Sequence, residues 1–136
     1  MQAIAGAQRD TALERCSGGL SIVESDSDGI RMLDVAGELE LATAVQLCAR
    51  VHAARGAGQR RLLVDLTQLE FCDSSGLRAL IGAAEDVLAS AGRIVIVPPV
   101  DGAVARLFAL IGAGELLPLR SSAAEALAAL EAAPRA

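Results

Sequence analysis

The hydrophobic pattern of the first half changes from strand-like to helix-like spacing. Residues 20–24 and 30–36 are short β-prone runs, and the Ser-Asp-Ser-Asp-Gly segment between them is typical of a hairpin turn. Between residues 43 and 55, apolar side chains recur at helical spacing, at Ala44, Leu47, Cys48 and Val51. The sequence therefore predicts a β-hairpin followed by an amphipathic helix, which the glycines at positions 56 and 58 terminate.

The second half alternates buried strands with amphipathic helices. Residues 61–66 are an almost continuous apolar run, which is typical of a strand covered on both faces. A helix is predicted from Ser74 until Gly92 stops it. Its inward stripe is Leu77, Leu80, Ile81, Ala84 and Leu88. Residues 93–97 form a further buried strand, which two prolines terminate.

The C-terminal part predicts two more helices and a last strand. Asp101 is placed as the N-cap of a short helix. The core face of that helix is Val104, Leu107, Phe108 and Ile111. Residues 116–119 are expected to form the final strand. Ser122 and Glu125 match a capping box, which opens a helix with Ala126, Leu127 and Leu130 turned inward.

This order of elements predicts an α/β fold in one domain, with a mixed, mostly parallel β-sheet of about five strands and about four helices.

Residues 1–19 show weak periodicity and end in Ser-Gly-Gly, so we expect a flexible N-terminal extension, with a turn or two of helix at residues 11–16. The domain itself is expected to span residues 20–136.

Composition narrows the possible partners. The chain has 136 residues, of which 53% are hydrophobic, so it is globular and long enough for a core. A net charge of −5 and the lack of Trp and Tyr argue against direct nucleic-acid binding.

Three widely spaced cysteines fit a reducing cytosol, and no cluster suggests a metal. With neither a signal peptide nor a long apolar run, we expect a cytoplasmic protein without membrane insertion.

The candidate chemistry lies where the second long helix begins, at Asp73, Ser74, Ser75 and Gly76. Two interpretations are open from these residues alone. Asp73 or Ser74 can serve as a helix cap and nothing more, because small polar side chains accept hydrogen bonds from the first N–H groups. Alternatively, Ser75 receives a phosphate, which a helix N-terminus can hold and which adds about −1.5 to −2 charges.

Enzymatic sites find little support in the sequence. His52 is the only histidine, no Gly-x-Ser-x-Gly elbow surrounds Ser75, and a lysine nucleophile is excluded because the chain has no lysine. Glycine-rich nucleotide-binding motifs are absent, so no cofactor is expected. Cys72 is interpreted as a small core residue in preference to a redox-sensitive thiol. We therefore predict a binding protein that is not an enzyme.

The segment from about residue 20 to residue 130 resembles a STAS domain, the fold of bacterial anti-sigma factor antagonists. The resemblance rests on four motifs in that family's order: Gly37-Glu38-Leu39-Glu40, Asp65-Leu66, Phe71, and Asp73-Ser74-Ser75-Gly76-Leu77. One departure is Glu40, where the family's turn usually ends in Asp.

The resemblance implies a phosphorylation-controlled partner switch. In that family, the unphosphorylated antagonist binds an anti-sigma factor that is also a serine kinase, which releases the sigma factor for transcription. The kinase then phosphorylates the second serine of the motif, here Ser75, and a serine phosphatase resets the cycle. Ser74 is implied to be a neighbouring cap. The partner-binding residues implied are Glu38, Glu40, Asp73, Ser74, Ser75, Gly76, Leu77 and Arg78, within residues 65–78 and the adjacent 38–43 loop.

Two other functions stay open at this point. The first is a STAS subunit associated with a membrane lipid or solute transporter. The second is an enzyme with an unrecognised site.

Overall fold

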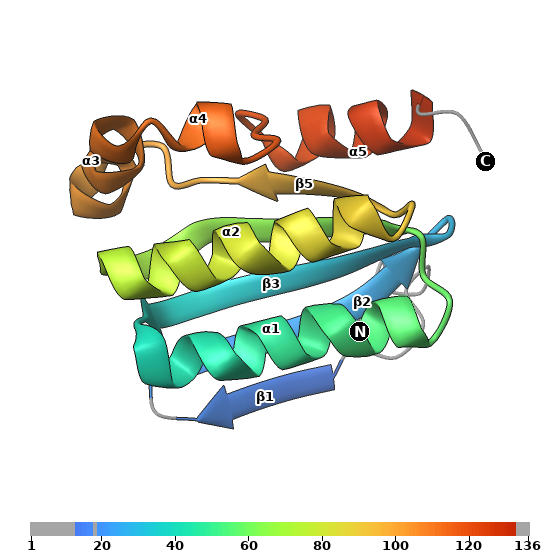
Figure 1. Ribbon diagram of the computed structural model, residues 1–136, viewed down its shortest axis with the longest axis horizontal. Helices are drawn as coiled ribbons and strands as arrows, with labels where there is room; N and C mark the ends of the chain where they lie inside the picture. The colour runs from blue at the N-terminus through green and yellow to red at the C-terminus, as the bar shows by residue number, and fades with distance from the viewer. Residues whose placement is uncertain (1–12, 18, 133–136) are drawn as a thin grey trace, which may run out of the picture.

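The computed structural model describes residues 13–17 and 19–132, with side chains described from residue 19 onward. The elements, in chain order, are β1 (Leu13–Ser17), β2 (Leu20–Ser27), β3 (Ile30–Leu39), α1 (Leu41–Gly56), β4 (Arg61–Cys72), α2 (Ser74–Ala89), β5 (Arg93–Val97), α3 (Gly102–Ile111), α4 (Ala113–Leu116) and α5 (Ala123–Ala132) (Figure 1). Of the described helices, none is both long enough and apolar enough to span a bilayer.

The strands form one mixed sheet in the order β1-β2-β3-β4-β5. The pairs β1–β2 and β2–β3 are antiparallel, whereas β3–β4 and β4–β5 are parallel. The predicted α/β fold with a mixed sheet is confirmed, and its parallel part begins only at β3.

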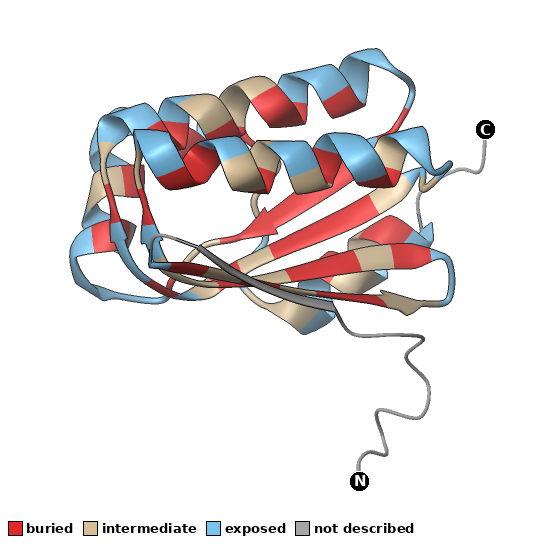
Figure 2. Ribbon diagram, turned by 90° about the horizontal axis from the view of Figure 1, so that it is seen from below, coloured by how far each residue is buried: buried red, intermediate tan, exposed pale blue. Residues whose placement is uncertain are grey.

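The sheet carries a hydrophobic core on each face. Helices α1 and α2 lie side by side over one face and turn their buried stripes toward it (Figure 2). On the opposite face, α5 covers β4 and β5 with Ala126 and Leu130. Alternation along β4 shows this directly, because Leu62 and Val64 belong to the first core and Leu63 to the second. The prediction of a strand covered on both faces is therefore confirmed.

The β2–β3 hairpin turns at two residues. Ser27 pairs with Ile30, and the intervening Asp28 and Gly29 both have positive φ, 52° and 79°. That geometry is typical of a type I′ turn, which fits the twist of antiparallel strands. The predicted hairpin is confirmed, with a tighter turn than the five-residue segment expected.

Strand β4 is longer than the sequence pattern indicated. It runs through Cys72, six residues beyond the apolar run at residues 61–66 from which the strand was predicted. The reason is pairing with β3, which also extends, through two register shifts, to the pairs Glu38↔Phe71 and Leu39↔Cys72. Both strands therefore end at the same edge of the sheet, so the first residues of α1 and α2 lie next to each other.

The expected final strand at residues 116–119 is wrong. Residues up to Leu116 form α4, and only Leu119 makes an isolated bridge to Ile96 of β5. Pro118 accepts a bond from the Ile96 N–H at 2.9 Å but has no N–H of its own to extend a ladder. The fifth strand is β1 instead.

Strand β1 lies within the segment that we expected to be a flexible extension. Residues 13–17 pair antiparallel with β2, from Leu13↔Glu24 to Ser17↔Leu20, so neither flexibility nor helix describes them. Residues 1–12 and 18 of that expectation lie outside the described residues.

Two predicted core positions are exposed. Leu88 is 47% exposed and Ile111 is 37% exposed, whereas Val87 is buried in the place expected for Leu88. Leu88 lies at the end of α2, beside the edge of the sheet, where no element of the described chain covers it. The other inward positions predicted for α1, α2 and α5 are buried or packed against the cores.

Candidate phosphorylation and docking site

Asp73 caps the N-terminus of α2. Its backbone is extended, with φ −102° and ψ 176°, and its carboxylate Oδ1 accepts a hydrogen bond from the Gly76 N–H at 2.8 Å. Its carbonyl oxygen accepts from the Leu77 N–H at 3.0 Å. Asp73 is therefore the N-cap and Ser74 the first helical residue, which corrects the capping role implied for Ser74.

Ser75 is the second residue of α2 and is exposed. Within the described residues, the hydroxyl groups of Ser74 and Ser75 make no hydrogen bond. Their backbone N–H groups belong to the first turn, which has no intrahelical acceptors and carries a partial positive charge. Both hydroxyls are therefore accessible at a position that favours a negatively charged group.

Gly76 joins the start of α2 to the turn between β3 and α1. A Cβ atom at this position would lie 2.5 Å from the Leu39 carbonyl oxygen and 3.1 Å from the Glu40 backbone nitrogen. The Asp73 N–H donates to the same carbonyl oxygen at 3.2 Å. Only a residue without a side chain allows this approach, so Gly76 brings Glu38 and Glu40 to the neighbourhood of Ser75.

The adjacent turn is fixed by a residue that sequence reasoning missed. Thr43 is 2% exposed; its Oγ1 accepts from the Glu40 N–H at 3.0 Å and donates to the Glu38 carbonyl oxygen at 2.8 Å. Glu40 is the N-cap of α1, and its side chain is half-buried. The spacing of three residues between Glu40 and a hydroxyl residue is the signal that could have revealed this contact.

The predicted site residues divide into exposed and buried groups. Glu38, Ser74, Ser75 and Arg78 are exposed, Glu40 and Asp73 are half-buried, and Gly76 and Leu77 are buried. The buried pair therefore offers no surface to a partner and supports the site from inside, which differs from the contact role implied for it.

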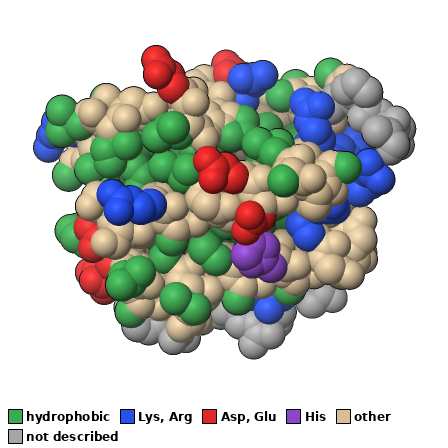
Figure 3. Space-filling view, in the orientation of Figure 1, with side chains coloured by type: hydrophobic (Ala, Val, Ile, Leu, Met, Phe, Trp, Pro, Cys, Tyr) green, Lys and Arg blue, Asp and Glu red, His purple; other side chains and the backbone are tan. Residues whose placement is uncertain are grey.

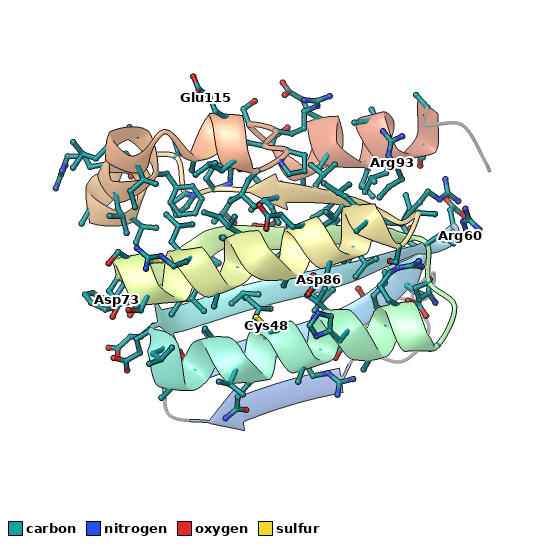
Figure 4. The ribbon with its side chains drawn as sticks, viewed as in Figure 1. Cys48, Arg60, Asp73, Asp86, Arg93 and Glu115 are labelled. Atoms are coloured by element: carbon teal, nitrogen blue, oxygen red, sulfur yellow. The ribbon has the colours of Figure 1, made fainter. Side chains whose placement is uncertain are left out.

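Exposed apolar side chains lie around the site. Leu41 at the start of α1 is 65% exposed, and Phe71 near the end of β4 is 47% exposed. We define the docking surface as Glu38, Leu41, Phe71, Ser75 and Arg78. It lies at the left end of the molecule, where Figure 4 labels Asp73, and Figure 3 shows hydrophobic and acidic side chains together there. Apolar surface with a charged rim is typical of protein–protein interfaces.

The cysteines near the helices are structural. Cys72 is buried, and burial, together with the charge of Asp73, raises the pKa of its thiol to about 11. Burial, and secondarily Asp86, also raises the pKa of Cys48, whose Sγ donates to the Ala79 carbonyl oxygen at 3.4 Å. Raised pKa values keep both thiols protonated, which disfavours a reactive thiolate.

His52 is half-exposed, and its Nε2 lies 3.2 Å from the Asp86 carboxylate across the α1–α2 seam. Among the described residues, no three His, Cys, Asp or Glu side chains group as metal ligands.

The STAS domain family, with the description "Mlab, STAS domain", matches residues 23–118. The chain therefore belongs to the STAS domain family.

Several relatives within this fold are named for sigma-factor regulation. BtrV of Bordetella bronchiseptica, which carries the name of an anti-sigma factor antagonist, is 29% identical over 78% of this chain and 90% of its own length. The crystal structure of an anti-sigma factor antagonist from Mycobacterium paratuberculosis is 26% identical, with a TM-score of 0.71 over 85% of this chain and 97% of its own. The unphosphorylated antagonist SpoIIAA, 20% identical, shares the fold with a TM-score of 0.64 over 92% of this chain and all of its own.

Proposed function

We propose that this protein is an anti-sigma factor antagonist that binds an anti-sigma factor with serine kinase activity while Ser75 is unphosphorylated. The single observation that carries the proposal is the exposed, unbonded Ser75 hydroxyl in the first turn of α2, beside the β3–α1 turn. Binding of the anti-sigma factor frees a sigma factor for transcription. The names of the relatives support this assignment.

Phosphorylation of Ser75 ends the interaction in this proposal. The kinase transfers the terminal phosphoryl group of ATP to the Ser75 Oγ, so that an O–P bond forms, the bond to ADP breaks and the hydroxyl proton is lost. The phosphate adds about −1.5 to −2 charges to the docking surface. Glu38 and Asp73 already make that end of α2 acidic, so the partner meets both new bulk and new charge. A serine phosphatase restores the free hydroxyl.

The fold tolerates this modification because the phosphate sits at a helix N-terminus. Free N–H groups of the first turn favour an anion there. Arg78 lies three residues after Ser75, on the same side of α2, so its exposed guanidinium can pair with the phosphate. Phosphorylation therefore changes the surface and leaves the cores intact.

The test begins with the Ser75→Ala protein as bait in a pull-down from the native cells, with identification of bound proteins by mass spectrometry. We expect the bait to capture an anti-sigma factor kinase, because Ser75→Ala lacks the hydroxyl group whose phosphorylation would release the partner. Capture of transporter subunits in its place would favour the alternative, a STAS subunit of a membrane lipid or solute transporter.

The captured kinase and ATP are then incubated with the parent protein, Ser75→Ala and the matched control Ser74→Ala. We expect phosphate on Ser75 in the parent and in Ser74→Ala, and none in Ser75→Ala. Ser75→Asp is expected to bind the partner at least tenfold more weakly than Ser75→Ala. Phosphate at another residue, or equal affinities of the two Ser75 variants, contradicts the mechanism.

A further inference from the structure

A groove of about 910 Å³ runs along the outer edge of β5, near the end of α2 that is remote from Ser75. Its walls are the last turn of α2, the short helix α4 and one side of α5. Figure 4 marks Arg93 at the start of β5 and Glu115 on α4. None of the contacts described for the docking surface involves this groove.

The floor of the groove is an open strand edge. Farther along β5, the outer side is occupied, because the Ile96 N–H donates to Pro118 at 2.9 Å and the Ile96 carbonyl accepts from the Arg120 N–H at 3.0 Å. Ile94 lies two residues earlier, so its N–H and C=O point to the same side. Within the described residues, neither group has a hydrogen-bond partner. Ile94 therefore presents a donor and an acceptor to any extended chain in the groove.

Two leucines expose apolar surface at the sides of this edge. Leu88 of α2 is 47% exposed, and Leu116 of α4 is 48% exposed. Both line the groove. A chain lying between them removes apolar surface from water, and that burial stabilises the complex.

The groove is also cationic, although the whole chain has a net charge of −5. Arg93 and Arg120 line it, both are exposed, and no ion pair joins either of them to a described carboxylate. Among the described residues, the Arg120 guanidinium donates only to the Leu119 carbonyl oxygen, at 3.2 Å. In the part of the chain that the structure describes, Glu115 is the one carboxylate in the lining. Charge complementarity therefore favours an acidic ligand.

We propose that this groove binds an extended acidic peptide segment of a partner protein as an added strand beside β5. The backbone of the segment bonds to Ile94, its carboxylates pair with Arg93 and Arg120, and its apolar side chains lie against Leu88 and Leu116. Addition of a strand to a free sheet edge gives affinity through the main chain and specificity through the side chains. Arginine–carboxylate pairs strengthen such contacts.

A second copy of this chain fits the groove less well. A two-fold pairing of β5 edges brings the same groove of both copies together. The described lining of each groove holds two arginines and one glutamate, so two net-cationic surfaces would meet and repel each other.

The groove is separate from the site of the proposed function. Leu88 lies thirteen positions after Ser75, which corresponds to about 20 Å along α2. A segment bound at β5 therefore leaves the docking surface free, and its binding does not depend on the phosphorylation of Ser75.

The probe is a fluorescein-labelled, end-capped peptide of alternating valine and glutamate, titrated with the full chain and followed by fluorescence anisotropy. We expect saturable binding. The same peptide with lysine for glutamate tests charge, and a version N-methylated at every second residue tests the main-chain bonds. Each is expected to bind at least tenfold more weakly. These controls alter only the peptide, so they are independent of variant folding.

Protein variants locate the binding. Arg93→Glu combined with Arg120→Glu is expected to lower the affinity at least tenfold, whereas Arg78→Glu on the docking surface and Ser75→Asp leave it unchanged. Slower hydrogen exchange of the Ile94 amide in the bound state is the direct readout. The proposal is overturned by absent binding at millimolar peptide, by equal binding of the glutamate and lysine peptides, by NMR shifts at the docking surface alone, or by a dimer that Arg93→Glu dissociates.

Discussion

Gly76→Ala adds one methyl group where α2 meets the β3–α1 turn. The new Cβ would lie 2.5 Å from the carbonyl oxygen of Leu39, 2.8 Å from its carbonyl carbon and 3.1 Å from the Glu40 nitrogen. All three atoms belong to the backbone, so no side-chain rotation relieves the overlap. The start of α2 and the turn must move apart.

The expected magnitude follows from two opposing effects. Overpacking at a closely packed position costs about 1–3 kcal/mol. Alanine has a better helix propensity than glycine, by up to about 1 kcal/mol. We therefore expect Gly76→Ala to lower the free energy of unfolding by about 1–2 kcal/mol. Gly82→Ala is the matched control in the same helix, because no atom other than those of the adjacent residues and the local helix backbone lies within 4 Å of its added Cβ. It should stabilise the protein by roughly 0.5–1 kcal/mol.

Urea unfolding of both variants, followed by far-UV circular dichroism and extrapolated to water, measures the difference. The reasoning is refuted if Gly76→Ala is as stable as Gly82→Ala. Under the proposed function, Gly76→Ala also weakens partner binding under conditions in which it remains folded, because Ser75 and Glu40 separate. Gly82→Ala leaves that binding unchanged.

Three further predictions concern hydrogen bonds and one thiol. Thr43→Val removes two bonds of the β3–α1 turn and should cost about 1–3 kcal/mol in urea unfolding, while Thr43→Ser retains most of the stability. Asp73→Ala should lose about 1 kcal/mol through the lost N-cap, and Asp73→Asn should keep most of it; equal losses would refute the cap. The pKa of Cys72 is raised from 9.0 to about 11, so the folded chain holds the thiol proton more tightly than the unfolded chain does. The raised pKa contributes at most about 3 kcal/mol to the free energy of unfolding. This contribution is complete below pH 9 and is lost as the pH rises through about 11. The decline in unfolding free energy over this range, measured by urea titration at each pH, should be shallower in Cys72→Ala.

The site was predictable from the sequence to the extent that it depends on neighbouring residues. Asp73 caps α2 because its short carboxylate reaches an N–H three residues later, and this places Ser75 in the exposed first turn. The role of Gly76 was not predictable in this way, because the atoms that exclude a side chain belong to Leu39 and Glu40, far away in the chain. The three-residue spacing of Glu40 and Thr43 signals only one contact of Thr43, because its hydrogen bond to the Glu38 carbonyl oxygen depends on the folded β3–α1 turn.

Periodicity predicted the elements better than it predicted their edges. Leu88 and Ile111 continue apolar stripes and still lie exposed, because a stripe records which side of a helix is apolar and not where its neighbours end. The strand expected at residues 116–119 has the right composition, but only Leu119 reaches β5. The segment that forms β1 has weak periodicity in the sequence, and it is a strand because its backbone pairs with β2.

The sequence by itself determined the hairpin, the alternation of strands and helices, and the exposed Ser75 at a helix start. Each of these follows from side-chain periodicity, turn chemistry or capping over a few residues. Tertiary structure alone decided the length of β4, the close approach of Gly76 to the β3–α1 turn and the open edge at Ile94. Those features depend on backbone atoms from distant segments, whose positions are fixed only when the sheet and both of its cores are assembled.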